Sequence, residues 1–273
     1  MRIAGAVIAI TGAGSGIGAE LARRFAAEGA EHLVLTDRDE AAVAELAGRL
    51  GPVAEARRLD VTDEAAVTGC VAEVLAAHGR IDLFCSNAGV ATGAGLDADP
   101  ATWQLAWDVH VLAHVYAARA VVPAMIERGA GYLLNTASAA GLLSAPGDAP
   151  YSVTKHASVA LAEWLAYQYA GRNIKVSVLC PMGVDTPLLM DGLAAGQPAA
   201  RAVAASAEVI SVAEVADAVV RGLAEESFLI LPHPRVGKFW AGKAAGIDHW
   251  LAGMAQLAEQ AGTTDPNDRA ERT

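Results

Sequence analysis

Short apolar runs rich in β-branched residues alternate with Ala-rich amphipathic stretches along most of the chain. Runs of this length and composition are typical of buried strands, and the longer stretches have the spacing of helices. The predicted strands span 6–11, 32–36, 53–59, 81–86, 131–138, 174–180 and 228–232. The predicted helices span 16–28, 39–50, 63–78, 100–128 and 212–225, and a further helix contains Tyr151.

Strands that alternate with helices predict an α/β fold, a doubly wound parallel sheet of about seven strands with helices on both faces. Several strand runs are apolar almost throughout, as expected for strands covered on both sides. No linker or internal repeat divides the chain, so we expect one domain over 1–262. Within it we expect a mobile substrate loop with a short helix at 187–211 and a helical extension at 233–260, and after it a disordered tail at 263–273.

The charge balance argues against two classes of partner. The chain has 20 Lys and Arg against 31 Asp and Glu, a net charge of −11, and its basic residues are not clustered. Nucleic-acid binding needs clustered cations, and anionic membranes attract basic segments. No uncharged apolar stretch approaches the ~20 residues that span a bilayer. We therefore expect no nucleic-acid partner and no membrane partner.

The cysteines and the N-terminal segment predict a cytoplasmic location. Cys70, Cys85 and Cys180 are odd in number and lack CxxC spacing, which fits a reducing compartment. Residues 3–19 carry no charge and faintly resemble a secretory signal. Their compact apolar run, "AVIAI", is short and is followed at once by a glycine-rich turn, so we do not expect a signal peptide.

Ligands of parallel sheets bind beyond the carboxyl ends of the strands, so chemistry is sought there. The first strand is followed by "TGAGSGIG" (11–18), whose glycines let backbone N–H groups approach a phosphate at a helix N-terminus. The spacing is TGxxxGxG and not GxGxxG. The alternative is a tight turn without a ligand. The candidate cofactor-binding residues of the turn are Gly12, Ser15, Gly16, Ile17 and Gly18.

The second and third strands end in further candidates. Asp37 can accept hydrogen bonds from an adenosine ribose and would repel a 2′-phosphate, which favours NAD over NADP, although Arg38 works against that preference. The alternative for Asp37 is a helix cap. Asp60 and Val61 can contact the adenine, but "DVTDE" also reads as a helix start capped by Thr62, and both readings stay open.

The fourth strand ends in "SNAG" (86–89), where small residues let the backbone pass close to a flat ligand. Its amide side chain can also tie neighbouring strands together, a structural role that we favour over a chemical one. The candidate cofactor contacts here are Asn87, Ala88 and Gly89.

The stretch "YSVTK" places Tyr151 and Lys155 one helical turn apart and so on one face of a helix. Free Tyr titrates near pH ~10 and free Lys near ~10.4. A nearby ammonium lowers the pKa of a phenol, so Tyr151 can exchange a proton with a substrate oxygen near neutral pH. Ser138, at the end of the fifth strand, can hydrogen-bond the same oxygen.

Together these motifs resemble the short-chain dehydrogenase/reductase family, in its shorter-chained TGxxxGxG/YxxxK subgroup, over roughly residues 4–232. The resemblance implies a Rossmann-type single domain, hydride transfer at nicotinamide C4, and a homodimer or homotetramer. It implies Tyr151 as the acid/base, Lys155 as its tuner and a ribose ligand, and Ser138 as the group that orients substrate. "CPMGVDTP" resembles the family's Pro-Gly stretch, which adds Pro181, Val184 and Thr186 to the cofactor residues.

The chain departs from the family pattern at two positions. Met182 replaces the glycine of the Pro-Gly stretch, and His110 stands where the family has an asparagine that helps hold a water near Lys155. We hypothesise that His110 is catalytic only when neutral and adds an acidic limb to the pH–rate profile, because imidazole titrates near ~6.5. The alternative is that it only packs. His110 and His114 lack further ligands at a recognised spacing, so no metal is expected.

The substrate pocket is predicted to be apolar, from the side chains of Leu142, Leu143, Met182, Leu188, Leu189 and Met190. Phe239, Trp240 and Trp250 cap that pocket or pack against a partner subunit. We therefore predict an NAD-dependent oxidoreductase that acts on a hydrophobic secondary alcohol or ketone. The alternative is a nucleotide-binding regulator of the same fold that has lost turnover through the two departures.

Overall fold

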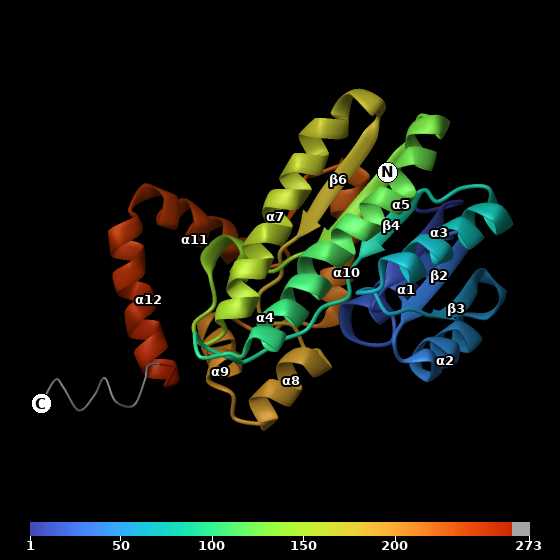
Figure 1. The fold of residues 1–273 in the computed structure, drawn as a ribbon. Coiled ribbons are helices and arrows are strands. Elements are labelled where there is room, and N and C mark those ends of the chain that lie inside the picture. Colours follow the sequence, from blue (N-terminus) through green and yellow to red (C-terminus); the bar gives the residue numbers. More distant parts are fainter. Residues whose placement is uncertain (264–273) are drawn as a thin grey trace, which may run out of the picture.

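All seven strands found in the described residues, 1–263, belong to one parallel sheet in this computed structural model (Figure 1). Their order across the sheet is β3-β2-β1-β4-β5-β6-β7. The chain starts in the middle, builds β2 and β3 on one side, and crosses over to continue from β4 on the other, which confirms the predicted doubly wound sheet. The strands are β1 Val7–Thr11, β2 His32–Asp37, β3 Ala54–Arg58, β4 Leu83–Ser86, β5 Gly131–Thr136, β6 Ile174–Leu179 and β7 Leu229–Ile230.

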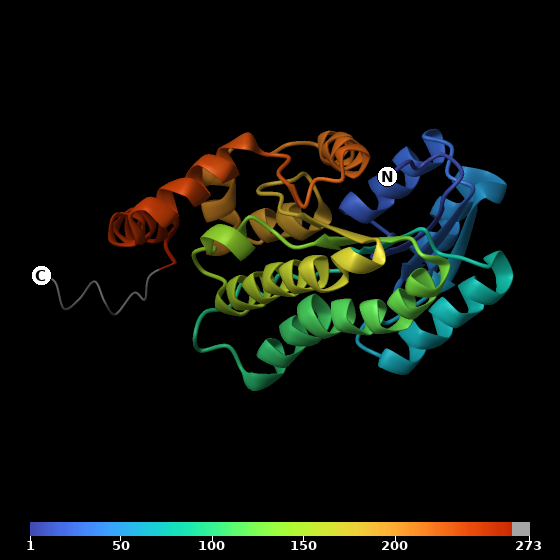
Figure 2. The same ribbon diagram turned by 90° about the horizontal axis from the view of Figure 1, so that it is seen from above.

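Alternate residues of each strand pack under opposite helix layers (Figure 2). In β1, Ile8 and Ile10 point into one core, whereas Val7 and Ala9 point into the other. The first core is covered by α1 (Gly16–Ala27), α2 (Glu40–Leu50) and α10 (Val212–Glu225). The second core is covered by α3 (Glu64–His78), α5 (Ala113–Arg128) and α7 (Ala149–Tyr169). Strands buried on both faces explain the nearly continuous apolar runs.

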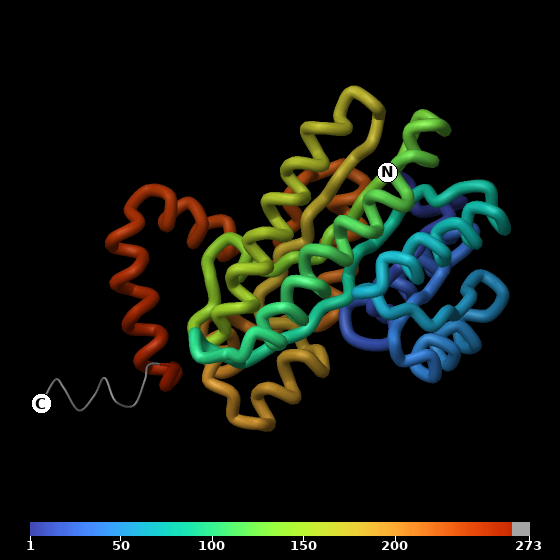
Figure 3. The backbone as a smooth tube through the Cα atoms, viewed as in Figure 1, coloured from blue at the N-terminus to red at the C-terminus, as the bar shows by residue number. Residues whose placement is uncertain are grey.

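The remaining helices form the side of the molecule opposite β3 and α2, as the tube in Figure 3 shows for the C-terminal part. The α9 helix packs against α8 and α12, and α11 packs against α6. Their bounds are α6 Ala140–Leu143, α8 Pro187–Ala194, α9 Pro198–Ser206, α11 Pro234–Ala245 and α12 Ile247–Ala261. Short 3₁₀ turns lie at Gly51–Val53 and Ala170–Arg172.

The segment 187–211 differs from the prediction, because it contains two helices and not a loop with one short helix. Pro187 and Pro198 each occupy the first turn of a helix, where the missing N–H costs no hydrogen bond. The Ala-rich run after Pro198 then has a high helix propensity. Of the predicted disordered tail, 263–273, only Thr263 is among the described residues, and the rest of that prediction lies outside them.

The predicted helix 100–128 is continuous but changes its winding. It consists of α4 (Pro100–Trp107), a π-helical turn at Asp108–Leu112 that contains His110, and α5. By length and composition it is the one helix within 1–263 that could cross a membrane, with a mean hydropathy of 1.5. However, 56% of its most apolar window is buried inside the protein, and α5 belongs to a helix layer on the sheet, so we assign it as a core helix.

Candidate active site

A cavity of about 720 Å³ lies across the carboxyl ends of the strands. It joins the predicted cofactor residues to the predicted catalytic residues Ser138, Tyr151 and Lys155. The predicted cofactor residues in its wall are Gly12, Ser15, Gly16, Ile17, Asp37, Arg38, Asp60, Val61, Asn87, Ala88, Gly89, Pro181, Val184 and Thr186. The site therefore sits where the strand order reverses between β1 and β4, as expected for a doubly wound sheet.

The glycine-rich turn uses two of its glycines for close backbone packing. Gly12 has a φ of +65°, and a Cβ there would lie 2.8 Å from the Ala88 Cα. A Cβ on Gly18 would lie 2.1 Å from the Gly12 carbonyl oxygen. Gly18 is absent from the part of the cavity wall that residues 1–263 form, and its close contact shows that a glycine there lets α1 pack onto the turn, whereas its contact with a cofactor stays a prediction.

The N-terminus of α1 fits the diphosphate of a dinucleotide. Within residues 1–263, the N-cap Ser15 makes no capping hydrogen bond, and the first turn of α1 holds no acidic side chain. Ser15, Gly16 and Ile17 all line the cavity. First-turn N–H groups and the helix dipole are thus left to bind an anion, which is the arrangement that a dinucleotide cofactor needs.

Asp37 is fixed by backbone N–H groups at the end of β2. Its Oδ2 accepts from Gly14 N at 3.0 Å and its Oδ1 accepts from Asp39 N at 3.0 Å. The cap of α2 is Asp39, whose side chain accepts from Ala42 N, so the alternative that Asp37 is a helix cap is wrong. Each oxygen keeps a lone pair for a hydroxyl of a ribose, and Arg38 lines the cavity beside it.

At the end of β3, the two readings of "DVTDE" are separated by geometry. Asp63 caps α3 and accepts from Ala65 N and Ala66 N, so the prediction of Thr62 as the cap is wrong. Thr62 instead donates from its N and its hydroxyl to Asp60 Oδ1, at 2.9 and 2.7 Å. These bonds lower the pKa of the Asp60 carboxyl and keep it an anionic acceptor at the cavity wall.

Asn87 ties three strands together. Its Nδ2 donates to the carbonyl oxygens of Thr11 at 3.2 Å and Gly12 at 3.3 Å, and its Oδ1 accepts from the Thr136 hydroxyl at 3.1 Å. The Thr136 carbonyl in turn accepts from Lys155 Nζ at 3.1 Å. The strand-tying role predicted for Asn87 is present, and it links the glycine-rich turn to the catalytic lysine.

Tyr151 and Lys155 titrate differently from the prediction. Enclosure by protein raises the pKa of Tyr151 to about 12, and the neighbouring Ser138 hydroxyl only partly opposes this. Burial lowers the pKa of Lys155, which is 3% exposed, to about 8. The ammonium lies 5.5 Å from the centre of the Tyr151 ring. In the protein alone, desolvation therefore outweighs the attraction between phenolate and ammonium.

Comparison with known proteins identifies the group to which this site belongs. The family model described as short chain dehydrogenase matches residues 6–195. The chain belongs to the short-chain dehydrogenase/reductase family. A crystal structure of such an enzyme from Burkholderia phymatum in complex with NAD superposes with a TM-score of 0.83 at 32% identity, covering 97% of this chain and 99% of that one.

Two curated dehydrogenases of the family are similar in sequence. The 1-deoxy-11-beta-hydroxypentalenate dehydrogenase of Streptomyces avermitilis is 36% identical over 242 residues, which cover 84% of this chain and 85% of that enzyme. The 2-keto-3-deoxy-L-fuconate dehydrogenase of Xanthomonas campestris is 38% identical over 190 residues, which cover 69% of this chain but only 61% of that enzyme. The chain is therefore an oxidoreductase that transfers hydride between a nicotinamide cofactor and an alcohol or carbonyl substrate. The comparisons give the regulator alternative no support.

His110, the chain's departure from the family's asparagine, is not placed to titrate. It is fully buried; its Nε2 accepts from Val90 N at 3.1 Å and its Nδ1 lies 2.8 Å from the Thr154 hydroxyl, which donates to Pro150 O. Desolvation first, and then the charge of Lys155, hold the pKa of His110 well below 6.5. With the pKa held there, we expect no acidic limb near ~6.5, and a catalytic role for the neutral ring stays a prediction. The hydrogen bonds of His110 join the loop after β4 to α7, which is the arrangement of a positioning residue.

Asp148 is a positioning residue that sequence reasoning missed. This buried carboxylate accepts from Tyr151 N at 3.0 Å, and so caps the helix that carries the catalytic tyrosine. It also accepts from Thr92 N at 2.9 Å, from Gly93 N at 2.7 Å and from the Thr92 hydroxyl. A signal was present in "DAP", an aspartate two residues before a proline that opens a helix.

His233 is a second missed residue, and it supports the stretch that contains Met182. Its Nδ1 accepts from Met182 N at 3.2 Å and its Nε2 lies 3.1 Å from Gly183 O, which fixes the tautomer with hydrogen on Nε2. Burial lowers the pKa of His233, so the ring stays neutral in this role. No sequence signal marks it, because its partners are 50 residues away.

The far part of the cavity is mostly apolar, but two predicted wall residues are missing from it. Among residues 1–263, Leu142 and Met190 are absent from the wall: Leu142 is buried in the core beside α7, and Met190 is 44% exposed. A helix turns about 100° per residue, so α8 cannot aim three successive side chains into one cavity. The apolar side chains that do line this part include Leu143, Met182, Leu188, Leu189, Phe239 and Trp250.

Proposed function

We propose that this enzyme is an NAD-dependent dehydrogenase/reductase of hydrophobic secondary alcohols and ketones. The observation that supports this proposal is that one cavity is lined by the Asp37 carboxylate, by Tyr151 and by a set of apolar side chains. The first feature bears on the cofactor and the second on the substrate. Figure 1 shows β2, which ends in Asp37, and α12 on opposite sides of the molecule.

The mechanism rests on two hydroxyls that hold one substrate oxygen. In carbonyl reduction Tyr151, protonated because its pKa is about 12, donates to that oxygen while Ser138 supports it. A bound nicotinamide supplies or accepts the hydride. In alcohol oxidation Tyr151 must first lose its proton, so that direction accelerates as the pH rises. Lys155 donates to the Thr136 carbonyl, and below its own pKa of about 8 it supplies positive charge that favours the phenolate.

The preference for NAD is supported by the environment of Asp37. Its two oxygens accept from backbone N–H groups, and no arginine or lysine within residues 1–263 is paired with it to offset the negative charge at this end of β2. A 2′-phosphate placed there would meet like charge. Arg38 lines the same cavity and reduces the preference without reversing it, since the carboxylate and not the guanidinium ends the strand.

The hydrophobic substrate class is supported by the wall that α8, α11 and α12 contribute. Phe239 and Trp250 lie with their ring centres 6.2 Å apart and both face the cavity. The Streptomyces relative is named for a deoxy-hydroxypentalenate and the Xanthomonas relative for a keto-deoxy sugar acid. The aromatic wall favours the first kind of substrate, because it offers apolar area and few hydrogen bonds.

We also propose a cytoplasmic homo-oligomer. Trp107, Trp164 and Tyr167 are 40%, 44% and 68% exposed, an amount of aromatic surface that a subunit interface would bury. Cys70, Cys85 and Cys180 are free thiols, which suits a reducing compartment.

Initial rates with a graded panel of secondary alcohols test the proposal. Each alcohol is offered with NAD⁺ and with NADP⁺, and a sugar alcohol serves as the hydrophilic comparison. We expect kcat/KM to be at least about tenfold higher with NAD⁺ and to grow with the apolar size of the alcohol. Tyr151→Phe is the matched control: it should lose turnover and keep its affinity for the cofactor. Equal kcat/KM for both cofactors, or best turnover of the sugar alcohol, would overturn the respective half of the proposal.

A further inference from the structure

Two histidines and a glutamate come together on the sheet face that α3 covers. In the β2–β3 register Val34 is paired with Glu55, and His32 lies two residues before Val34, so all three side chains project from one face. Val34 and Val74 of α3 belong to the same hydrophobic core, and His78 lies four residues after Val74 on the same side of that helix. None of these residues is in the cavity wall that residues 1–263 form.

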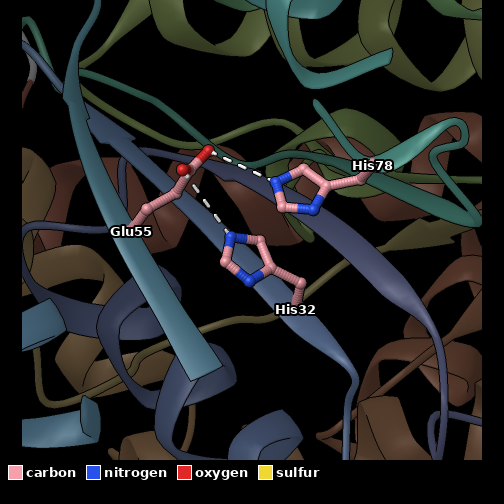
Figure 4. A group of neighbouring side chains, drawn as sticks. All are labelled: His32, Glu55 and His78. Carbon is pink, nitrogen blue, oxygen red and sulfur yellow. Dashed lines mark ion pairs between the residues drawn. The ribbon is translucent and has the colours of Figure 1, made fainter. Parts of the chain in front are cut away.

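The three side chains converge on one point (Figure 4). His32 Nε2 lies 3.7 Å from Glu55 Oε2, and His78 Nε2 lies 3.9 Å from Glu55 Oε1. One ligand atom of each residue lies within 4.8 Å of those of the other two. Both Nε2 atoms are buried, and neither has a hydrogen-bond partner among residues 1–263. Buried polar atoms are normally satisfied, so two unsatisfied nitrogens facing one carboxylate indicate a missing ligand.

We propose that His32, Glu55 and His78 bind one divalent transition-metal ion, with Zn²⁺ as the best match. Two imidazole nitrogens and one carboxylate oxygen are a ligand set that Zn²⁺ uses, with water in the fourth position. Mg²⁺ and Ca²⁺ prefer oxygen ligands throughout and are poor matches. The site does not depend on the proposed function.

The distances are close to those of a coordinated ion. Zn²⁺ bonds of about 2.0–2.2 Å at tetrahedral angles place ligand atoms about 3.3 Å apart. The 3.7 Å between His32 Nε2 and Glu55 Oε2 needs only small side-chain rotations to reach this value. His78 Nε2, which lies 3.9 Å from Oε1, turns toward the same ion, and the three ligand atoms already lie within 4.8 Å of one another. The two imidazole rings are stacked with centres 4.0 Å apart and planes at 27°, and this stack opens slightly when both nitrogens turn toward one ion.

Arg57 orients Glu55 and leaves one of its two carboxylate oxygens free to bind an ion. Its Nε and Nη2 contact Glu55 Oε1 at 3.0 and 2.9 Å, which leaves Oε2, the oxygen nearer His32, to coordinate. Carboxylates that bind metals are commonly hydrogen-bonded in this way. Arg57 also pairs with Glu73 of α3, and this second carboxylate offsets the guanidinium charge that faces the site.

The ion would fasten three elements that are distant in sequence. His32 begins β2, Glu55 is near the start of β3, and His78 ends α3. The same two strands carry Asp37 and the Asp60 segment at their other ends. The bound ion therefore stabilises the half of the sheet that holds the adenosine-side residues, from the end opposite the cavity.

Metal binding by full-length protein without an affinity tag tests the proposal. After removal of metals with a chelator, Zn²⁺ is titrated in competition with a chromophoric chelator, and Co²⁺ is titrated while its visible absorption is recorded. We expect one ion per chain and the intense absorption of four-coordinate Co²⁺. His32→Gln, His78→Gln and Glu55→Gln should each lower the Zn²⁺ affinity at least about tenfold. Zn²⁺ should also raise the Tm of the unmodified protein and not that of these variants.

Two variants serve as matched controls. His156→Gln removes a histidine of α7, and Glu45→Gln removes a carboxylate of α2 that pairs with Arg49 and not with the site; both should bind Zn²⁺ as the unmodified protein does. Failure of the unmodified protein to bind one ion, or unchanged binding by a His32→Gln/His78→Gln protein, would overturn the proposal. Alcohol oxidation is not a readout, so the result is independent of the proposed function.

Discussion

Lys155 carries a charge that the fold must desolvate. Because its pKa falls from 10.5 to about 8 on folding, the unfolded chain holds a proton between these pH values that the folded chain has lost. Raising the pH across that window therefore increases the free energy of unfolding, and below it the buried ammonium is a cost. The loss of stability is tolerated because proton transfer by Tyr151 requires this positive charge, and active sites commonly trade stability for activity in this way.

Replacing this lysine should make the protein more stable and inactive. We expect Lys155→Met to raise the free energy of unfolding at pH 7 by on the order of 1–3 kcal/mol and by much less at pH 10, where the unmodified residue is already neutral. Urea denaturation at the two pH values measures the difference. Lys175→Met, at an exposed lysine paired with Glu226, should show no such pH-dependent gain. If Lys155→Met raised the free energy of unfolding equally at pH 7 and pH 10, the buried charge of Lys155 would not be the cause.

His110 offers the opposite case, a titratable residue held neutral. We expect His110→Asn to leave the pH dependence of kcat/KM unchanged between pH 5 and 8, since the pKa of His110 already lies well below 6.5. The free energy of unfolding should fall by about 1–3 kcal/mol, because the shorter amide cannot reach both Val90 N and the Thr154 hydroxyl. If the unmodified enzyme has an acidic limb in its pH profile of kcat/KM and His110→Asn lacks it, then His110 does titrate during catalysis.

For single residues, the sequence predicts which side chains meet in the site but not their pKa values. The spacing of Tyr151 and Lys155 places both on one helix face, and Ser138 follows a strand, so their meeting could be predicted. The size of the desolvation could not, because it depends on packing from β5, β6 and the loops around them. The neutrality of His110 likewise depends on its burial and on the charge of Lys155, which no local pattern connects to it.

Between elements, Asp148 joins the loop after β4 to the start of α7. Asp148→Ala should lower the free energy of unfolding by about 1–3 kcal/mol, because it removes a helix cap and the acceptor of the partly buried N–H groups of Thr92 and Gly93. It should also lower kcat more than cofactor affinity, since Tyr151 loses its anchor. Thermal unfolding and steady-state kinetics measure both.

Asp99 supplies the control for this change. It caps α4 through one hydrogen bond, to Thr102 N at 2.6 Å, and it lies outside the cavity wall formed by residues 1–263. Asp99→Ala should therefore lower the Tm by less than Asp148→Ala does and leave kcat unchanged. If the two variants behaved alike in kcat, Asp148 would be a cap and nothing more.

Elements with a strong local pattern could be predicted, and those decided by tertiary contacts could not. The apolar runs of β1, β2 and β5 were sufficient to predict these strands, because both of their faces are buried. In the segment that forms α8 and α9 the sequence predicts only one short helix, because these stretches of eight and nine residues are too short to show a clear apolar stripe. The π-helical turn at Asp108–Leu112 has no sequence signature that we recognise, and we have no physical account of why the winding changes there.

Across the whole molecule, the cofactor side and the substrate side of the cavity come from different parts of the chain. Trp250 of α12 lies in the cavity wall, whereas Trp240 of α11 is 43% exposed and outside the part of the wall that residues 1–263 form. We expect Trp250→Ala to raise KM for bulky substrates about tenfold, roughly 1.4 kcal/mol, and to leave KM for the cofactor unchanged. Trp240→Ala should change neither the KM for bulky substrates nor the KM for the cofactor. If Trp250→Ala changed only the KM for the cofactor, the assignment of α12 to the substrate side would be wrong.

The order of the strands also decides when the cavity can appear as the chain leaves the ribosome. β1, β2 and β3 follow one another in sequence and pair directly, so this half can close early through contacts of short range. The other edge of β1 waits for β4, because Thr11 and Asn87, which join them, are 76 residues apart. At about 5–20 residues per second, that edge stays open for roughly 4–15 s. Slow translation before residue 87 therefore prolongs the period in which a nascent chain can pair with a neighbour and aggregate.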